Sequence, residues 1–256
     1  MTLRFDMAWV LGTLLVSVRV AAATAFTSVF GPTQIPAPAR VVLVLGLSAA
    51  LISVITVPVA TASFSLLSLL LAVLGEVSIG LAFAFGFIAA YAATQIAGRV
   101  LDTQIGFSAA GVLNPATLTM SPLLGNLFGM LAIAVFLALD GHLLLIEALS
   151  MSLQAMPPGS QLSSANAPAI LAHSSASFVF ALAIAGPIMG LLALSDIALA
   201  ALARSMPQLN VLVLGFAIKI MLGLCGLTLG VHLARAVLEQ LFASTFLYWD
   251  GLATER

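Results

Sequence analysis

The sequence predicts an all-α membrane protein, built from about six long, partly kinked apolar helices arranged in hairpins. Three observations lead to this fold class. Apolar residues make up 62% of the 256 residues and charged residues only 7%, whereas about a quarter of the residues in a soluble protein are charged. The mean hydropathy is +1.22. The apolar runs also reach the ~20 residues that a membrane-crossing helix needs, and segments with glycine and proline separate them.

Six helices are expected, each ending near residues that break helices. They cover residues 7–30, 41–60, 66–98, 124–156, 170–203 and 211–246. The first helix ends at GPTQIPAPAR, where prolines prevent it from continuing. The charges at Asp6 and Arg19 do not fit a cleaved secretory signal, so we expect this helix to be retained. The fourth run contains Asp140-Gly141-His142 at its middle and is either one kinked helix or two short ones.

A long break in the apolar pattern covers residues 99–122, RVLDTQIGFSAAGVLNPATLTMSP. Glycine and proline at this density cannot continue a helix, so the sequence predicts a loop. Irregular backbone at membrane depth is tolerated only where protein or a water-filled cavity surrounds it. Because this loop also carries bulky apolar side chains, we interpret it as the constriction or plug of a pore. The residues assigned to the gate are Ile105, Gly106, Phe107, Gly111, Leu113 and Met120. The alternative for Phe107 is packing against a partner helix.

Titratable side chains in or beside the apolar runs form a second set of candidates. A lone charge at the bilayer centre costs about 2.5–3.5 kcal/mol, so each should pair or face an aqueous cavity. We expect structural pairing within or between subunits, for example of Glu76 or Asp196 with a base. The expected bases are Lys219 and Arg19. The full set of structural or assembly charges is Arg19, Glu76, Arg99, Asp102, Asp140, His142, Asp196 and Lys219.

Other kinds of chemistry find little support in the sequence. A net charge of −1 provides no basic surface for nucleic acid. HExxH, CxxC and Walker-type motifs are absent, and GFSAAG at residues 106–111 does not match the G-x-S-x-G pattern of hydrolases. We therefore expect no enzyme activity, no cofactor and no metal. The alternative class is a proton-coupled secondary transporter, in which Asp140, His142 and Glu147 form a proton relay.

Three segments carry a more specific pattern. They are RVAAATAFTSVFGPTQIPAPAR, AGRVLDTQIGFSAAGVLNPATLTMSPLLGNLFGMLAIAVFLALDGHLLLIEALSMSLQAMPPG and ARSMPQLNVLVLGFAIKIMLGL. Together they resemble the FliR family of flagellar biosynthetic proteins, subunits of the type III protein export gate. The resemblance covers nearly the whole chain in the same order. The pieces LDTQIGFS, LALDGH, MPPG and MPQLN with Lys219 are fairly specific to this family and its injectisome relatives.

The resemblance implies a structural, pore-forming subunit without enzyme activity. Such subunits assemble with FliP-like and FliQ-like subunits, contact FlhB-like and FlhA-like proteins, and pass unfolded flagellar substrates. Residues 1–165, including the plug loop 99–122, would be FliP-like. Residues 166–256 would form a FliQ-like helical hairpin and a C-terminal tail.

The resemblance also implies a place and a role for the loop. Loop 105–122 would contribute to closing the channel, in agreement with the plug interpretation. The chain would be a multi-pass protein of the bacterial inner membrane, in contact with membrane lipid, and would belong to the flagellar basal body. The alternative is the injectisome version of the same subunit, which serves virulence secretion.

Overall fold

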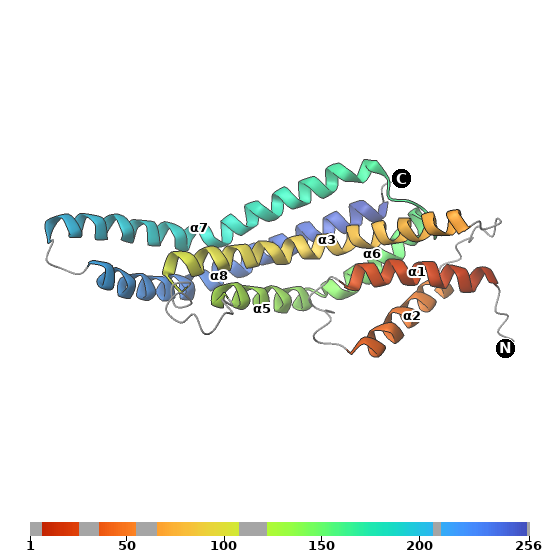
Figure 1. The fold of residues 1–256 in the computed structure, drawn as a ribbon, viewed down its shortest axis with the longest axis horizontal. Helices are drawn as coiled ribbons and strands as arrows, with labels where there is room; N and C mark the ends of the chain where they lie inside the picture. The colour runs from red at the N-terminus through yellow and green to blue at the C-terminus, as the bar shows by residue number, and fades with distance from the viewer. Residues whose placement is uncertain (1–6, 26–35, 55–65, 108–121, 207–210, 255–256) are drawn as a thin grey trace. The chain divides into compact units, whose positions relative to one another are not determined.

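The computed structural model describes residues 7–25, 36–54, 66–107, 122–206 and 211–254. Within these residues all regular structure is helical, which confirms the predicted all-α class. The helices are shown in Figure 1, and their bounds are α1 Met7–Ala25, α2 Ala37–Val54, α3 Leu66–Ile105, α5 Leu123–Ala138, α6 Gly141–Ala155, the 3-10 turn η1 Ser164–Asn166, α7 Ala167–Ser205 and α8 Val211–Thr254.

Prolines mark the starts of several helices. Pro122 lies directly before α5, and Pro38 and Pro168 lie in the first turns of α2 and α7. The first turn tolerates proline because its backbone N–H groups have no partner within the helix. Pro187 is different, since it lies inside α7 and removes one hydrogen bond from the helix interior.

Helix α3 is longer than the sequence predicts, because it continues to Ile105 rather than ending at Gly98. Residues 99–105, expected in the plug loop, are therefore helical, and that boundary was wrong. The physical reason is packing. Gly98 lies against the backbone of Gly125 in α5, where a Cβ atom would not fit. Leu101 and Ile105, one turn apart, are fully buried, so tertiary contacts outweigh the poor helix propensity of glycine.

The run expected over residues 124–156 forms two helices, α5 and α6. Asp140 lies at the break with φ of 53°, in the left-handed region. Its carbonyl oxygen accepts hydrogen bonds from the backbone N–H groups of Leu143 and Leu144, at 2.9 and 3.1 Å. Aspartate is among the few residues other than glycine that adopt this conformation readily. Of the two options left open by the sequence, the structure confirms two short helices.

The chain divides into two compact units. The first comprises residues 1–89, 140–174 and 243–256, and the second comprises residues 90–139 and 175–242. In the first unit α1 packs against α2, around an apolar cluster of Val16, Val20, Val44, Leu51 and Leu153. In the second unit the buried rings of Phe136 and Phe242 lie 5.5 Å apart between centroids. The predicted division into a FliP-like part, residues 1–165, and a FliQ-like part, residues 166–256, requires comparison with those proteins and stays a prediction.

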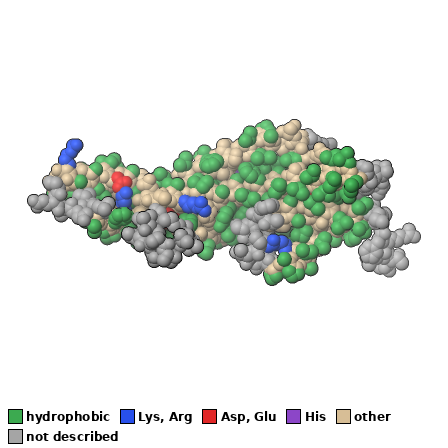
Figure 2. Space-filling model, viewed as in Figure 1, with side chains coloured by type: hydrophobic (Ala, Val, Ile, Leu, Met, Phe, Trp, Pro, Cys, Tyr) green, Lys and Arg blue, Asp and Glu red, His purple; other side chains and the backbone are tan. Residues whose placement is uncertain are grey.

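The helices have the composition of membrane segments. Among the described residues α3 and the stretch Ser164–Ser205 are long and apolar enough to cross a bilayer, and α5 with α6 makes a third if they form one broken span. Shorter apolar helices cover Trp9–Thr24, Ala37–Ser53 and Val213–Thr228. On the face drawn in Figure 2 apolar side chains predominate and charged ones are few. These properties are typical of a protein embedded in a membrane.

Candidate functional site

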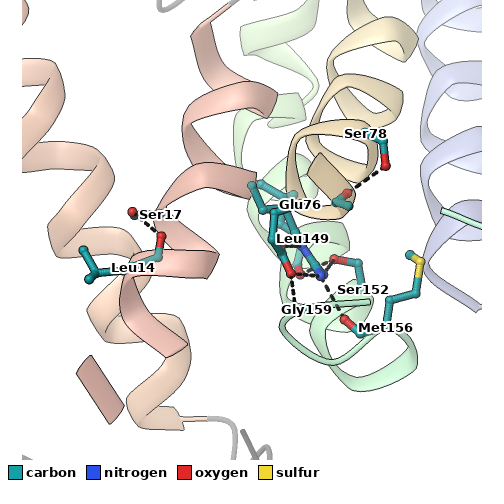
Figure 3. A network of polar contacts seen from close by, with 10 residues as sticks. Leu14, Ser17, Glu76, Ser78, Leu149, Ser152, Met156 and Gly159 are labelled. Atoms are coloured by element: carbon teal, nitrogen blue, oxygen red, sulfur yellow. Dashed lines mark hydrogen bonds and ion pairs between the residues drawn. The ribbon is translucent and has the colours of Figure 1, made fainter. Parts of the chain in front are cut away.

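A buried ion pair joins three helices of the first unit. Arg19 of α1 donates from Nε to Glu76 Oε2 at 2.6 Å and from Nη2 to Oε1 at 3.1 Å, a bidentate arrangement with Glu76 of α3. Arg19 also donates to Ser152 Oγ at 3.1 Å and to the carbonyl oxygen of Met156 at 2.9 Å. Figure 3 shows Glu76 beside Ser152 and Met156 of the α6 end. The predicted pairing of Glu76 with a base is thus present, and the base is Arg19.

Glu76 has a further partner in the turn that follows α6. The backbone N–H of Gly159, whose φ is +93°, donates to Glu76 Oε1 at 2.7 Å (Figure 3). Gly75 and Gly80 lie on either side of Glu76 along α3. A Cβ atom at Gly75 would meet the carbonyl oxygen of Ser160, and one at Gly80 would meet α1 at Arg19 and Ala22. The two glycines therefore let the turn and α1 approach closely enough for the carboxylate to reach both.

A second carboxylate stabilises the start of helix α5. Asp102, in the last turn of α3, accepts the backbone N–H of Leu124 with both oxygens, at 3.0 and 3.1 Å, and that of Gly125 at 3.3 Å. These N–H groups open α5, whose preceding residue Pro122 provides no side-chain cap. Asp102 is therefore an N-terminal cap delivered from another helix, and its charge is also favourable at the positive end of α5. It therefore holds the end of α3 to the start of α5.

The structure describes only the start of the predicted gate. Ile105, assigned to the plug, is helical and fully buried, and it packs where Gly223 of α8 leaves room. The assignment of Ile105 to the loop was wrong because its side chain completes a helix interface. Gly106 has φ of +98° beside the Phe216 ring, and Phe107 is half-buried. The other gate residues, Gly111, Leu113 and Met120, lie outside the described residues.

A second charge pair lies in the second unit. Lys219 Nζ of α8 is 2.7 Å from Asp196 Oδ1 of α7, and the two side chains are 24% and 46% exposed. The predicted pairing of Asp196 with a base is therefore present as well. Because part of both groups stays accessible, the pair is available to further partners. Its role in assembly stays a prediction.

The proposed proton relay is not assembled in the described residues. Asp140 and Glu147 are exposed, and no hydrogen bond or ion pair joins their side chains to each other or to His142. His142 Nδ1 is buried without a hydrogen-bond partner. Arg99, another member of the charge set, is exposed on α3. In the described part of the chain no group of three or more His, Cys, Asp and Glu side chains is placed to hold a metal ion.

A cluster of polar aromatic side chains escaped the sequence analysis. Tyr248 Oη and Trp249 Nε1 of α8 donate to the carbonyl oxygens of Ala82 and Phe83 in α3, at 3.0 and 2.8 Å. The ring of His173 stacks on that of Tyr248 with centroids 4.6 Å apart. The sequence signal was available, because tyrosine and tryptophan in an apolar run need partners for their polar atoms. The cluster fixes the end of α8 to α3 within the first unit.

Comparison with known proteins identifies the relationship. The chain matches the family described as bacterial export proteins, family 1, over residues 10–245. The chain belongs to this family. It is 34% identical to flagellar biosynthetic protein FliR of Escherichia coli (strain K12) over 184 residues, which cover 72% of this chain and 70% of the relative.

Two further relatives extend the comparison. Flagellar biosynthetic protein FliR of Bacillus subtilis (strain 168) is 30% identical over 236 residues, covering 91% of this chain and 90% of the relative. Surface presentation of antigens protein SpaR of Shigella sonnei is 27% identical over 149 residues, which are 58% of each chain. The resemblance to FliR-type export proteins that the sequence motifs indicated is confirmed.

Proposed function

We propose that this chain is a structural, pore-forming subunit of the flagellar type III protein export gate, located in the bacterial inner membrane. It assembles with FliP-like and FliQ-like subunits, contacts FlhB-like and FlhA-like proteins, and passes unfolded flagellar proteins. The observation that carries the proposal is the alignment with the Bacillus subtilis FliR over 91% of this chain and 90% of the relative. A relationship over nearly the full length of both proteins supports a shared role rather than one shared segment.

The surface of the helices supports assembly with other apolar proteins. Helix α7 exposes large apolar side chains along much of its length, namely Phe178, Val179, Leu182, Leu194 and Ile197. Such a surface is stable only against lipid or against other apolar helices. The partly exposed Lys219–Asp196 pair would add a polar contact in such an interface.

We further propose that the segment after α3, residues 106–122, contributes to channel closure. Apolar side chains can close a pore by excluding water from its narrowest part. Gly106, whose φ of +98° is open to glycine but strained for other residues, follows the last residue of α3 and ends the helix. Asp102 and the buried Ile105 anchor the loop at its base, so the closing side chains are those that follow, from Phe107 onward.

The export role is tested by deleting the gene and restoring it on a plasmid. We expect loss of motility and of flagellar protein secretion, and recovery of both with the plasmid. The tagged chain should co-purify with several other apolar proteins, and alone in liposomes it should show no substrate-dependent proton flux. Intact motility with lost secretion of virulence proteins would favour the injectisome alternative, which the relationship to SpaR supports.

Closure is tested by replacing residues 107–113 with a glycine-serine linker while Ile105 and Gly106 are kept. We expect the complex to assemble and the membrane to leak ions, because apolar side chains no longer exclude water. A variant with the same seven residues in shuffled order is the control, since it keeps the apolar content of residues 107–113. Conductance at the wild-type level with the linker in place would contradict the plug assignment.

A further inference from the structure

Most acidic side chains in the described part of the chain already have a partner. Glu76 binds Arg19, Asp196 binds Lys219, and Asp102 caps α5. Glu239 pairs with Arg235 one turn away on α8. The exceptions in this part of the chain are Asp140, Glu147 and Asp250, whose carboxylates are exposed and unpaired.

Two of these three carboxylates lie at one groove. It is formed within the first unit by α6 and the last turns of α8, and its volume is 530 Å³. Glu147 comes from α6 and Asp250 from α8. The rest of the lining is almost wholly apolar and includes Leu144, Met151, Phe246 and Leu247. The groove thus combines an apolar surface with two uncompensated negative charges.

The α8 side of the groove is held in place before anything binds. Trp249, which lines the groove, is fully buried and donates to the carbonyl oxygen of Phe83 at 2.8 Å. Its neighbour Tyr248 donates to that of Ala82 at 3.0 Å. Leu247, which precedes these anchors in the chain and also lines the groove, is 73% exposed. A surface ordered in advance loses less entropy on binding, which favours a specific partner.

The charges determine what kind of partner fits. A carboxylate covered by apolar groups is costly unless a base pairs with it. Of the bases in the described residues, Arg19, Lys219 and Arg235 are already paired, and Arg40, Arg99 and Arg204 do not line the groove. The two remaining bases, Arg4 and Arg256, lie outside the described residues. No base of the described part of the chain is therefore placed at the groove, and a base on a partner helix would offset its charges.

We propose that the α6–α8 groove binds an apolar helix of another export-gate subunit, on which a lysine or arginine pairs with Glu147 and Asp250. This proposal rests on the proposed function, because it requires a gate with several subunits. It goes beyond that function by naming the surface of the first unit that is bound, the α6–α8 groove, and the chemistry of its partner, an apolar helix with a base. The apolar side chains of the partner helix cover Leu247 and Met151, and its base offsets both carboxylates.

The test places a photo-crosslinking amino acid at position 247 of the full chain in its native cells. The control position is Leu143, which is exposed on α6 but does not line the groove. We expect position 247 to crosslink to a helix of another gate subunit within one turn of a lysine or arginine, and position 143 not to give this product. The crosslinked peptide is identified by mass spectrometry after extraction in mild detergent.

Charge dependence is measured in the same assay. The double variant Glu147→Gln, Asp250→Asn should reduce the crosslink about tenfold, as expected when a covered base loses its partners. Asp140→Asn removes an unpaired carboxylate of the same unit away from the groove and should leave the crosslink unchanged. The thermal stability of the tagged chain in detergent shows that the variants fold.

Several results would overturn the proposal. They are a crosslink to lipid alone, to a second copy of this chain, or to a helix without a nearby base, and an undiminished crosslink in the double variant. Co-purification of the wild-type chain separates the two claims. If other gate subunits co-purify but position 247 does not reach them, only the groove proposal fails. If no gate subunit co-purifies, the proposed function fails and the groove proposal with it.

Discussion

The two ion pairs that join different helices differ in how deeply they are buried and in how many hydrogen bonds their charged groups make. In the first unit Arg19 and Glu76 are 1% and 0% exposed, and Ser152, Met156 and Gly159 satisfy their remaining groups. In the second unit Lys219 and Asp196 meet through one contact and stay 24% and 46% exposed. In both units a charge in an apolar helix has found an opposite charge, but the result is a fully enclosed network in the first unit and a partly exposed pair in the second.

The difference teaches what each pair can do. A buried pair is costly to form, because both charges lose water, and it becomes very destabilising once one partner is removed. A partly exposed pair adds little to stability in water but remains able to bind a third group. We therefore expect Arg19 and Glu76 to hold the first unit together, and Lys219 and Asp196 to act in assembly. Two predictions test this contrast directly, and a third, on the helix cap Asp102, gives an effect of intermediate size for comparison.

The largest effect is expected for Glu76→Gln, which leaves the guanidinium of Arg19 buried without its counter-charge. The free energy of unfolding should fall by about 3–5 kcal/mol, as for other broken buried pairs. Denaturation of the purified chain in detergent measures it. The double variant Arg19→Met, Glu76→Leu should recover most of the loss, because it removes both charges together. A single variant as stable as the wild type would contradict the buried network.

An intermediate effect is expected for Asp102→Ala, which removes the cap of α5. The loss should be about 0.5–2 kcal/mol, the range for helix N-caps. Asp102→Asn keeps one acceptor oxygen and should lose less. Gln104→Ala, an exposed change two residues away on α3, is the control and should change stability little. Equal unfolding transitions for Asp102→Ala and the control would show that the cap is not stabilising.

The smallest effect on stability is expected for Lys219→Ala, about 1 kcal/mol or less, because the pair is partly exposed. The variant should nevertheless impair assembly more than channel closure. The yield of co-purified partner subunits should fall clearly, whereas ion leakage through the assembled channel should change little. Arg235→Ala breaks an exposed pair along one helix and is the matched control, which should alter neither quantity. Partner subunits recovered at normal yield with Lys219→Ala would refute the assembly role.

Much of the local structure could be predicted from the residues. The apolar runs and prolines located every described α-helix, though not the 3-10 turn at Ser164–Asn166, since both act over a few neighbouring positions. The break at Asp140 was visible as a polar, glycine-containing interruption. The end of α3 was not predictable in this way. Gly98 looks like a helix end in the sequence, and only the backbone of Gly125 in another helix makes glycine necessary inside α3.

The sequence by itself determined the fold class, the family motifs and the need of each intramembrane charge for a partner, because hydropathy and charge are properties of the residues alone. The tertiary structure decided which partner each charge has. Glu76 could have paired with either base, but Gly75 and Gly80 bring α1 and the turn at Gly159 to it. It also left Glu147 and Asp250 together and unpaired at one groove. Pairing needs contact within a few ångströms, and residues far apart in the chain reach that distance only through packing.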